Sequence, residues 1–217
     1  STRRHGKVVV AGLAREGVSE GAGGGADALG LRFGMTGRLV VGSFAPIDRL
    51  EYGSGRDESA WNRFVIHLDD ATTVRLNDPR RLGSVELDPD LGRLGPDATA
   101  ITVDELAAAL RSARAVKAVL LDQAAIAGLG NLLVDEALWR AGVDPARAAA
   151  ELSGDEVAAL RRSVRATIRV LSRRGGSHRG DLQAERSLAG RCPRDGAALL
   201  RRRIGGRTTY SCPRCQA

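Results

Sequence analysis

The sequence has 217 residues, of which 43% are hydrophobic and 27% charged, as in folded globular proteins with one large or two small domains. No apolar run reaches the roughly 18 residues of a membrane span, and no secretory signal opens the chain, so we expect a location in the cytoplasm or nucleoid. Basic residues number 33 against 26 acidic ones, and nearly all are arginine, which favours a polyanionic partner. An aromatic content of 3% argues against a single-strand binder with stacking platforms.

The first part of the chain has the pattern of an antiparallel β-sheet protein. Short β-branched segments, several of them alternating apolar with polar residues, are bounded by turn residues. A stretch rich in glycine and alanine, 16–28, is expected to be a loop. Strands are predicted at 7–11, 38–41, 61–68 and 72–76. We therefore predict that residues 1–97 form part of a β-sandwich domain.

Helical spacing replaces the strand pattern after Pro96. Helices are predicted at 103–114, 116–122, 131–141 and 153–172. The last of these begins at a capping serine, Ser153, followed by Asp155 and Glu156 in the first turn. We predict an α+β chain in which a helical domain over 98–176 is joined by a polar linker, 177–191, to a compact tail, 192–217.

The tail contains all three cysteines in a spacing typical of metal sites. Cys192-Pro-Arg-Asp195 is followed, after sixteen residues, by Cys212-Pro-Arg-Cys215. Two such pairs can complete a tetrahedron around zinc, although an aspartate stands where a zinc ribbon has its second cysteine. One interpretation is a structural Zn²⁺ held by Cys192, Asp195, Cys212 and Cys215. The alternative is a hairpin held by packing alone, with free thiols.

Two further features could bind phosphate. A predicted Gly-Gly turn places Arg207 at the start of the second strand of the tail hairpin, from which a guanidinium can reach a phosphate. The turn 128–130, Gly-Leu-Gly, precedes a helix that begins at Asn131, and free amides at a helix N-terminus attract phosphate. Each has a plain alternative, which is a solvated basic face for the hairpin and a simple helix–helix connection for the turn.

Five blocks of sequence, in order, resemble the formamidopyrimidine-DNA glycosylase/endonuclease VIII family. The segment "LDQ…GLGN…DEALW" is similar to its helix–two-turn–helix signature, and "GGRTTYSCPRCQ" is similar to its C-terminal zinc finger. Earlier, "RHGK", "FGMTG" and "DPRRLG" resemble three blocks of the family's β-sandwich domain. Together the blocks extend over essentially the whole chain, which makes the set far more specific than any single block.

The resemblance implies roles for individual residues. Lys7 would lie near the scissile sugar and phosphate, and Arg80 would face the orphaned base. Met35 and Leu82 would fill the gap left by a flipped-out lesion, with Leu82 standing where the family often has phenylalanine. The alternatives are that Met35 and Leu82 are core residues and that Arg80 is a surface salt-bridge partner. The implied phosphate ligands of the other domains are Asn131 and Arg207.

The implied activity is that of a monomeric DNA glycosylase and AP lyase of base-excision repair, acting on oxidised bases in damaged duplex DNA. The family's nucleophile is an N-terminal proline, followed by a glutamate, that forms a Schiff base with the sugar. We expect this segment to be missing here, so that the 217 residues alone are inactive. The amine of Ser1 is not expected to reach Lys7. The alternatives are a non-catalytic damaged-DNA binder or fragment, and a zinc-ribbon module for protein interactions.

Overall fold

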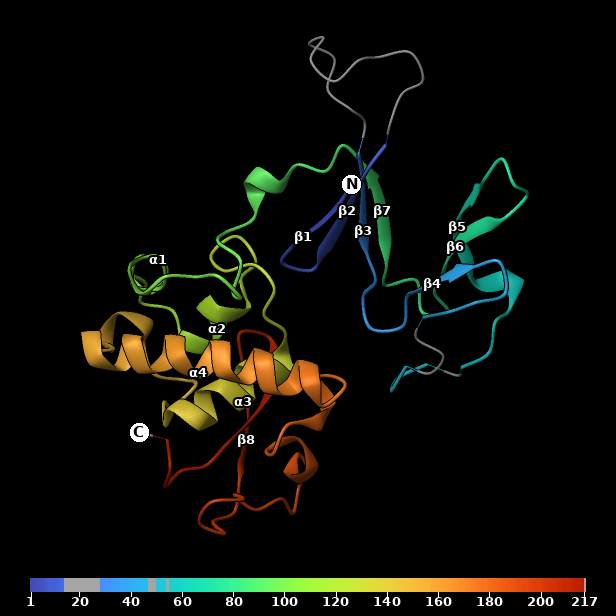
Figure 1. The fold of residues 1–217 in the computed structure, drawn as a ribbon. Helices are drawn as coiled ribbons and strands as arrows, with labels where there is room; N and C mark the ends of the chain where they lie inside the picture. The colour runs from blue at the N-terminus through green and yellow to red at the C-terminus, as the bar shows by residue number, and fades with distance from the viewer. Residues whose placement is uncertain (14–27, 47–49, 54, 217) are drawn as a thin grey trace. The chain divides into compact units, whose positions relative to one another are not determined.

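The computed structural model describes residues 1–13, 28–46, 50–53 and 55–216 (Figure 1). The chain divides into two compact units, Ser1–Leu91 and Gly92–Ala217, each of which is described by itself. Among the described residues, no helix combines the length and the apolar character that crossing a membrane demands.

The first unit contains two antiparallel sheets. Four strands are ordered β1-β2-β3-β7, and three are ordered β4-β6-β5. The first sheet comprises β1 (Thr2–His5), β2 (Val8–Gly12), β3 (Ala28–Arg32) and β7 (Ser84–Leu87). The second comprises β4 (Arg38–Val41), β5 (Asn62–His67) and β6 (Thr73–Asn77). Alternating valines and leucines of both sheets are buried, which gives the unit its core.

The four predicted strands are confirmed as β2, β4, β5 and β6. Strands β1, β3 and β7 were not predicted, because β1 and β7 are mostly exposed and β3 contains Gly30, a residue type that is depleted in strands. The predicted loop 16–28 falls almost wholly outside the described residues, and its last residue, Ala28, begins β3.

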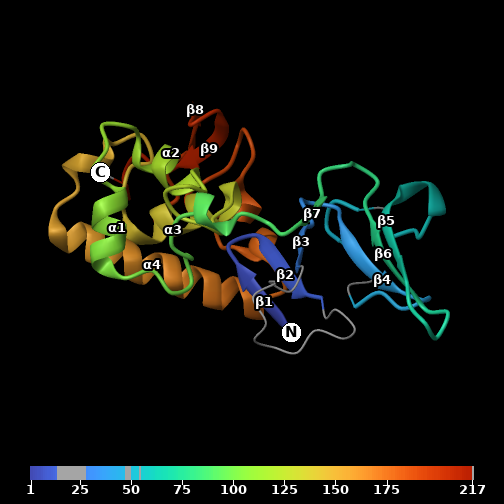
Figure 2. The ribbon, with the colours of Figure 1, turned by 90° about the horizontal axis from the view of Figure 1, so that it is seen from above.

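The second unit is built on four helices and a hairpin. The helices are α1 (Val103–Ala109), α2 (Val116–Leu121), α3 (Asn131–Ala141) and α4 (Gly154–Arg173). The hairpin consists of β8 (Leu200–Ile204) and β9 (Arg207–Ser211). Helix α3 contacts both α4 and β9, and seen from above it lies between the hairpin and α4 (Figure 2). Leu106, Leu120, Leu138 and Leu160, one from each helix, are buried in a shared core.

Helix α4 begins as predicted, and α1 ends earlier than predicted. The Ser153 hydroxyl accepts a hydrogen bond from the Glu156 amide, and the Glu156 carboxylate accepts one from the Ser153 amide. The predicted helix 103–114 is wrong beyond Ala109. The chain after it turns away so that the Arg114 carbonyl accepts from the Ala149 amide. This tertiary pairing overrides the helical propensity of the segment.

A candidate nucleic-acid interface and metal centre

The tip of the hairpin presents Arg207. Gly205 and Gly206 form a two-residue turn, and both have positive φ (57° and 73°), as a type I′ turn requires. A Cβ on Gly205 would lie 3.1 Å from the Ala118 Cα, so the turn rests closely against α2. Arg207 follows at once and is exposed, and its guanidinium has no hydrogen-bond or ion-pair partner among the described residues.

The carbonyl oxygen of Thr208 fixes the strand beside Arg207. It accepts hydrogen bonds from the Lys117 Nζ (3.3 Å), the Asn131 Nδ2 (3.1 Å) and the Arg186 Nη2 (3.3 Å). These donors come from α2, from the first residue of α3 and from the segment after α4. Arg207 is therefore held beside the N-terminus of α3 by contacts from three parts of the unit.

A buried ion pair lies beneath this contact. The Lys117 Nζ is 2.6 Å from the Asp135 Oδ1, and both side chains are 0% exposed. Lys117 also donates to the Thr209 hydroxyl, and Arg186 pairs with the second carboxylate oxygen of Asp135. Burial lowers the pKa of Lys117, and the charge of Asp135 opposes that shift. Removal of either partner would leave a buried charge uncompensated, so the pair and its hydrogen bonds to β9 tie α2, α3 and β9 into one arrangement.

The N-terminus of α3 is left open to a ligand. No side chain caps it at Gly130, and its first amides lack acceptors within the helix. Gln123 shapes the preceding turn, donating to the Leu121 and Leu129 carbonyls and accepting from the Gly128 amide. The sequence analysis quoted Gln123 within a motif and assigned it no role. The Asn131 Oδ1 is buried without a hydrogen-bond partner among the described residues.

In the first unit, three segments that carry predicted site residues meet at one end of the four-stranded sheet. Because neighbouring strands are antiparallel, the start of β2, the end of β3 and the start of β7 lie at the same end of the sheet. The turn before β2 carries Lys7, the turn after β3 carries Met35, and the loop before β7 carries Arg80 and Leu82.

Asp78 connects two of these segments. Its buried carboxylate accepts from the Thr36 hydroxyl (2.5 Å) and from the amides of Arg80 (3.2 Å), Leu82 (2.6 Å) and Gly83 (2.7 Å). Burial alone would raise the pKa of Asp78, but these hydrogen bonds outweigh it and lower the pKa below 3.8. Asp78 therefore positions the Met35 turn and the Arg80–Leu82 loop together, although the sequence analysis did not single it out.

The three residues on these two loops point away from the core. Met35 is 50% exposed and Leu82 is 47% exposed, which excludes the interpretation of either as a core residue of the unit. Arg80 is exposed and forms no ion pair with any carboxylate that the structure describes. Gly34 has a φ of +58°, and a Cβ there would lie 2.6 Å from the Leu82 Cβ, so only glycine allows this approach.

Ser1 lies at the opposite end of the sheet from Lys7. Its carbonyl accepts from the Gly12 amide (2.8 Å), at the far end of the β1–β2 hairpin. The four residues of β1 separate Ser1 from the turn at Gly6, and five steps along an extended chain correspond to about 16 Å at 3.3 Å per residue. The α-amine of Ser1 is therefore remote from Lys7.

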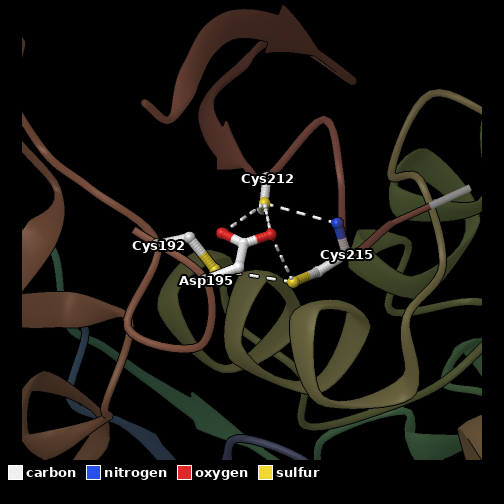
Figure 3. Close-up of side chains that lie close together, drawn as sticks. All are labelled: Cys192, Asp195, Cys212 and Cys215. Atoms are coloured by element: carbon white, nitrogen blue, oxygen red, sulfur yellow. Dashed lines mark hydrogen bonds between the residues drawn. The ribbon is translucent and has the colours of Figure 1, made fainter. Parts of the chain in front are cut away.

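The four predicted metal ligands come together at the base of the hairpin (Figure 3). Their ligand atoms all lie within 4.8 Å of one another. The Cys192 and Cys215 sulfurs are 3.7 Å apart, and the Asp195 Oδ2 is 3.5 Å from the Cys212 Sγ and 3.2 Å from the Cys215 Sγ. Tetrahedral zinc with Zn–S bonds of about 2.3 Å separates its sulfurs by about 3.8 Å, so the donor set fits zinc.

Neighbouring groups support the same fit. The Trp139 indole donates to the Cys192 Sγ, and the amides of Arg214 and Cys215 donate to the Cys212 Sγ. Such N–H···S bonds stabilise thiolates, the form that binds metal. The Asp195 carboxylate raises the pKa of the Cys215 thiol to about 12, so this thiol must release its proton when a cation binds.

Family models match both units of the chain. The formamidopyrimidine-DNA glycosylase N-terminal domain matches residues 1–85, and the formamidopyrimidine-DNA glycosylase H2TH domain matches residues 93–180. The sheets, the helix–two-turn–helix element and the cysteine-bearing hairpin define a class of helix–two-turn–helix DNA-repair proteins. Within that class, the chain belongs to the formamidopyrimidine-DNA glycosylase/endonuclease VIII family.

Individual relatives agree with this assignment. The formamidopyrimidine-DNA glycosylase of Roseiflexus is 41% identical over 70% of this chain and 64% of its own length. That of Paracoccus denitrificans is 38% identical over 86% of this chain and 74% of its own length. The chain thus spans about two thirds to three quarters of these relatives.

Solved structures show the same fold. The MutM (Fpg) protein of Thermus thermophilus superposes on 99% of this chain and 81% of its own, with a TM-score of 0.73 and 28% identity. The Lactococcus lactis Fpg noncovalently bound to DNA containing an AP site covers 99% of this chain and 80% of its own, with a TM-score of 0.73 and 25% identity.

Proposed function

We propose that this protein acts in base-excision repair, at the bacterial nucleoid in the cytoplasm, as a DNA glycosylase and AP lyase on oxidised bases in duplex DNA. The residues described here bind the duplex and recognise the lesion. The family assignment supports this function, as do relatives named for formamidopyrimidine-DNA and a relative bound to abasic DNA.

The observation that carries the proposal is the cluster at one end of the four-stranded sheet. Two exposed apolar side chains, Met35 and Leu82, stand beside the exposed Arg80 on loops joined through Asp78. Apolar side chains that enter a base stack hold open the gap that a flipped-out nucleotide leaves, and a guanidinium can hydrogen-bond the base that remains. Lys7, at the same end, would contact the phosphate beside the reacting sugar.

In the second unit, we propose that Arg207 and Asn131 bind the sugar-phosphate backbone. Arg207 is exposed beside the open N-terminus of α3, where helix amides favour an anion. One N–H of the Asn131 amide is used on Thr208, and the other is available for a phosphate. Such contacts position a duplex without reading its sequence.

Substitutions separate the two proposed roles. Arg207→Ala and Asn131→Ala should weaken binding to abasic and intact duplexes equally, and Arg207→Ala should reduce the log–log salt slope by about 1. Arg80→Ala should reduce the preference for the abasic duplex while leaving the salt slope nearly unchanged. Fluorescence anisotropy titrations at several salt concentrations measure both quantities. Equal losses on both duplexes for Arg80→Ala would argue against a role opposite the orphaned base.

A polypeptide of these 217 residues offers its own test of the chemistry. Because the Ser1 amine lies a strand's length from Lys7, we expect borohydride reduction on an abasic duplex to trap no covalent adduct, while binding persists. This result would be that of a damaged-DNA binder. A strong adduct retained when Ser1 is acetylated would point to another amine, and Lys7→Gln would then identify it.

We also propose that Cys192, Asp195, Cys212 and Cys215 hold a structural Zn²⁺ that stabilises the hairpin and so the position of Arg207. Purified protein should contain about one zinc ion per chain, and Cys212→Ser should abolish it. Asp195→Cys should retain zinc longer against a chelator than the unchanged protein, and Asp195→Ala should retain it less. Metal analysis by mass spectrometry measures each, and a zinc content near zero in folded protein would rule out the site.

A further inference from the structure

Helix α4 carries a row of arginines that no part of the proposed function uses. Four of them are exposed: Arg162, Arg165, Arg169 and Arg173. They are three or four residues apart, so neighbouring members lie on one face at intervals of about 4.5–6 Å along the helix axis. With Thr99 and the half-buried Arg161, the first three of them line a shallow hollow of about 590 Å³. We refer to these four residues as the α4 arginine row.

The row lies opposite the buried face of α4. At about 100° per residue, its members centre on the direction of Arg162 and the buried side chains centre some 180° away. Those buried side chains are Val157, Leu160, Val164, Thr167 and Leu171. Figure 2 shows α3 between α4 and the hairpin. Because the buried face of α4 packs on α3, the opposite face, which carries the row, is directed away from the hairpin that presents Arg207.

The charge of the row is uncompensated. Several arginines elsewhere in this unit are paired with carboxylates, as Arg140 is with Glu136, Arg147 with Glu156 and Arg202 with Asp144. No described carboxylate pairs with any member of the row. Like charges three or four residues apart on a helix repel each other and destabilise it. The fold thus maintains an unfavourable row of positive charge on a face that packing does not require.

We propose that the α4 arginine row is a second DNA-binding surface, which holds the phosphate backbone of a separate duplex segment while the hairpin side binds the first. A regular row of guanidiniums complements the closely spaced phosphates of a duplex. The hollow that the row lines includes no aromatic side chain, and its one large apolar residue, Ile168, is half-buried, so it lacks the exposed anchors typical of protein interfaces. Two packed helices, at roughly 8–10 Å between axes, separate it from the hairpin, so a straight duplex on the hairpin does not reach it.

Bridging of two undamaged duplexes tests the inference. Donor-labelled and acceptor-labelled duplexes mixed with the protein at low salt should show energy transfer, which increasing salt abolishes. Replacing all four residues of the row with glutamine should remove the transfer and leave the affinity for one abasic duplex within about threefold. Replacing all four with lysine, the matched control, should preserve the transfer. Glutamine keeps the helical propensity, and a thermal melt confirms that the variants are folded.

Three results would overturn the proposal. The glutamine variant could bridge as the unchanged protein does, or it could lose affinity for a single duplex in proportion, which would make the row part of the first surface. Polyglutamate could also displace DNA from the row as well as a duplex of equal total charge does, which would indicate an acidic protein as the partner. Because the bridging measurement uses undamaged duplexes, failure of lesion recognition would leave its outcome unaffected.

Discussion

Asp78→Asn should abolish most of the preference for damaged DNA without weakening backbone binding. The native carboxylate accepts four hydrogen bonds, from Thr36, Arg80, Leu82 and Gly83, and an asparagine offers a single acceptor oxygen in the same space. Donors left unsatisfied in a buried site cost about 1–3 kcal/mol each, so we expect a loss of about 2–3 kcal/mol in the stability of the first unit. With the two loops no longer joined, Met35 and Leu82 should cease to act together, and the ratio of abasic to intact affinity should fall at least tenfold.

Thr36 supplies the matched controls. Thr36→Val removes the hydroxyl that binds Asp78 and should reproduce part of the loss, whereas Thr36→Ser keeps the hydroxyl and should preserve discrimination. The salt slope, which reports phosphate contacts, should be unchanged in all three variants. If folded Asp78→Asn protein discriminates abasic from intact duplex as well as the unchanged protein does, Asp78 is not a positioning residue.

The Asp78 carboxylate should also make the stability of the first unit depend on pH in the acid range. Because its pKa in the folded state lies below 3.8, the ordinary value, the ionised form is favoured by folding. Its contribution to stability is fully present above pH 3.8 and is lost as the pH falls through the lower, folded-state pKa. Asp78→Asn should therefore flatten the acid limb of a plot of unfolding free energy against pH.

The second large effect is expected at Lys117. Lys117→Met removes the cation that lies 2.6 Å from a fully buried carboxylate, Asp135, and leaves Arg186 as the remaining charged partner. Breaking a buried pair from one side costs about 3–5 kcal/mol, because the remaining charge stays out of water. The hairpin also loses a donor to Thr208 and one to Thr209. We therefore expect a large fall in Tm together with weaker binding to every duplex.

A second substitution shows whether the charge is the cause. In the double variant Lys117→Met, Asp135→Asn, the buried carboxylate that has lost its Lys117 partner is replaced by a neutral amide, so much of the lost stability should return. Thr209→Val removes the hydrogen bond that the hydroxyl accepts from the Lys117 Nζ and the one that it donates to the Arg207 carbonyl, but leaves no charge unpaired, so it should cost less, about 2 kcal/mol. Thermal and urea unfolding measure these differences, and additive effects of the Lys117 and Asp135 substitutions would contradict a coupled pair.

The elements with strong local signals could be predicted from the sequence. The capping serine Ser153 and the apolar, β-branched segment 38–41 predicted a helix start and a strand, and the cysteine spacing indicated the ligand set that the fold brings together. Each of these signals depends on residues close in sequence. Strand β1 is polar and mostly exposed, so it has no apolar periodicity from which a strand could be predicted, although it pairs with β2.

The residues that sequence analysis missed act through contacts distant in the chain. Lys117 lies in an apolar helix and finds its partners at Asp135 and at Thr209, 92 residues away. Asp78 lies within a quoted motif, but its link to Thr36 spans 42 residues and follows from the sheet register. A buried charge can be inferred only when its partner is known, which a single sequence does not supply.

Affinity for an abasic duplex, compared with an intact duplex across a salt series, tests the central proposal most directly. We predict tighter binding to the abasic duplex, together with a log–log salt slope of roughly −4 to −6, as five or six phosphate contacts require. The proposed contacts with the sugar-phosphate backbone would be contradicted if protein that is folded, and whose zinc content has been measured, binds neither duplex at low salt. Equal affinity for both duplexes would contradict the role given to Met35, Arg80 and Leu82.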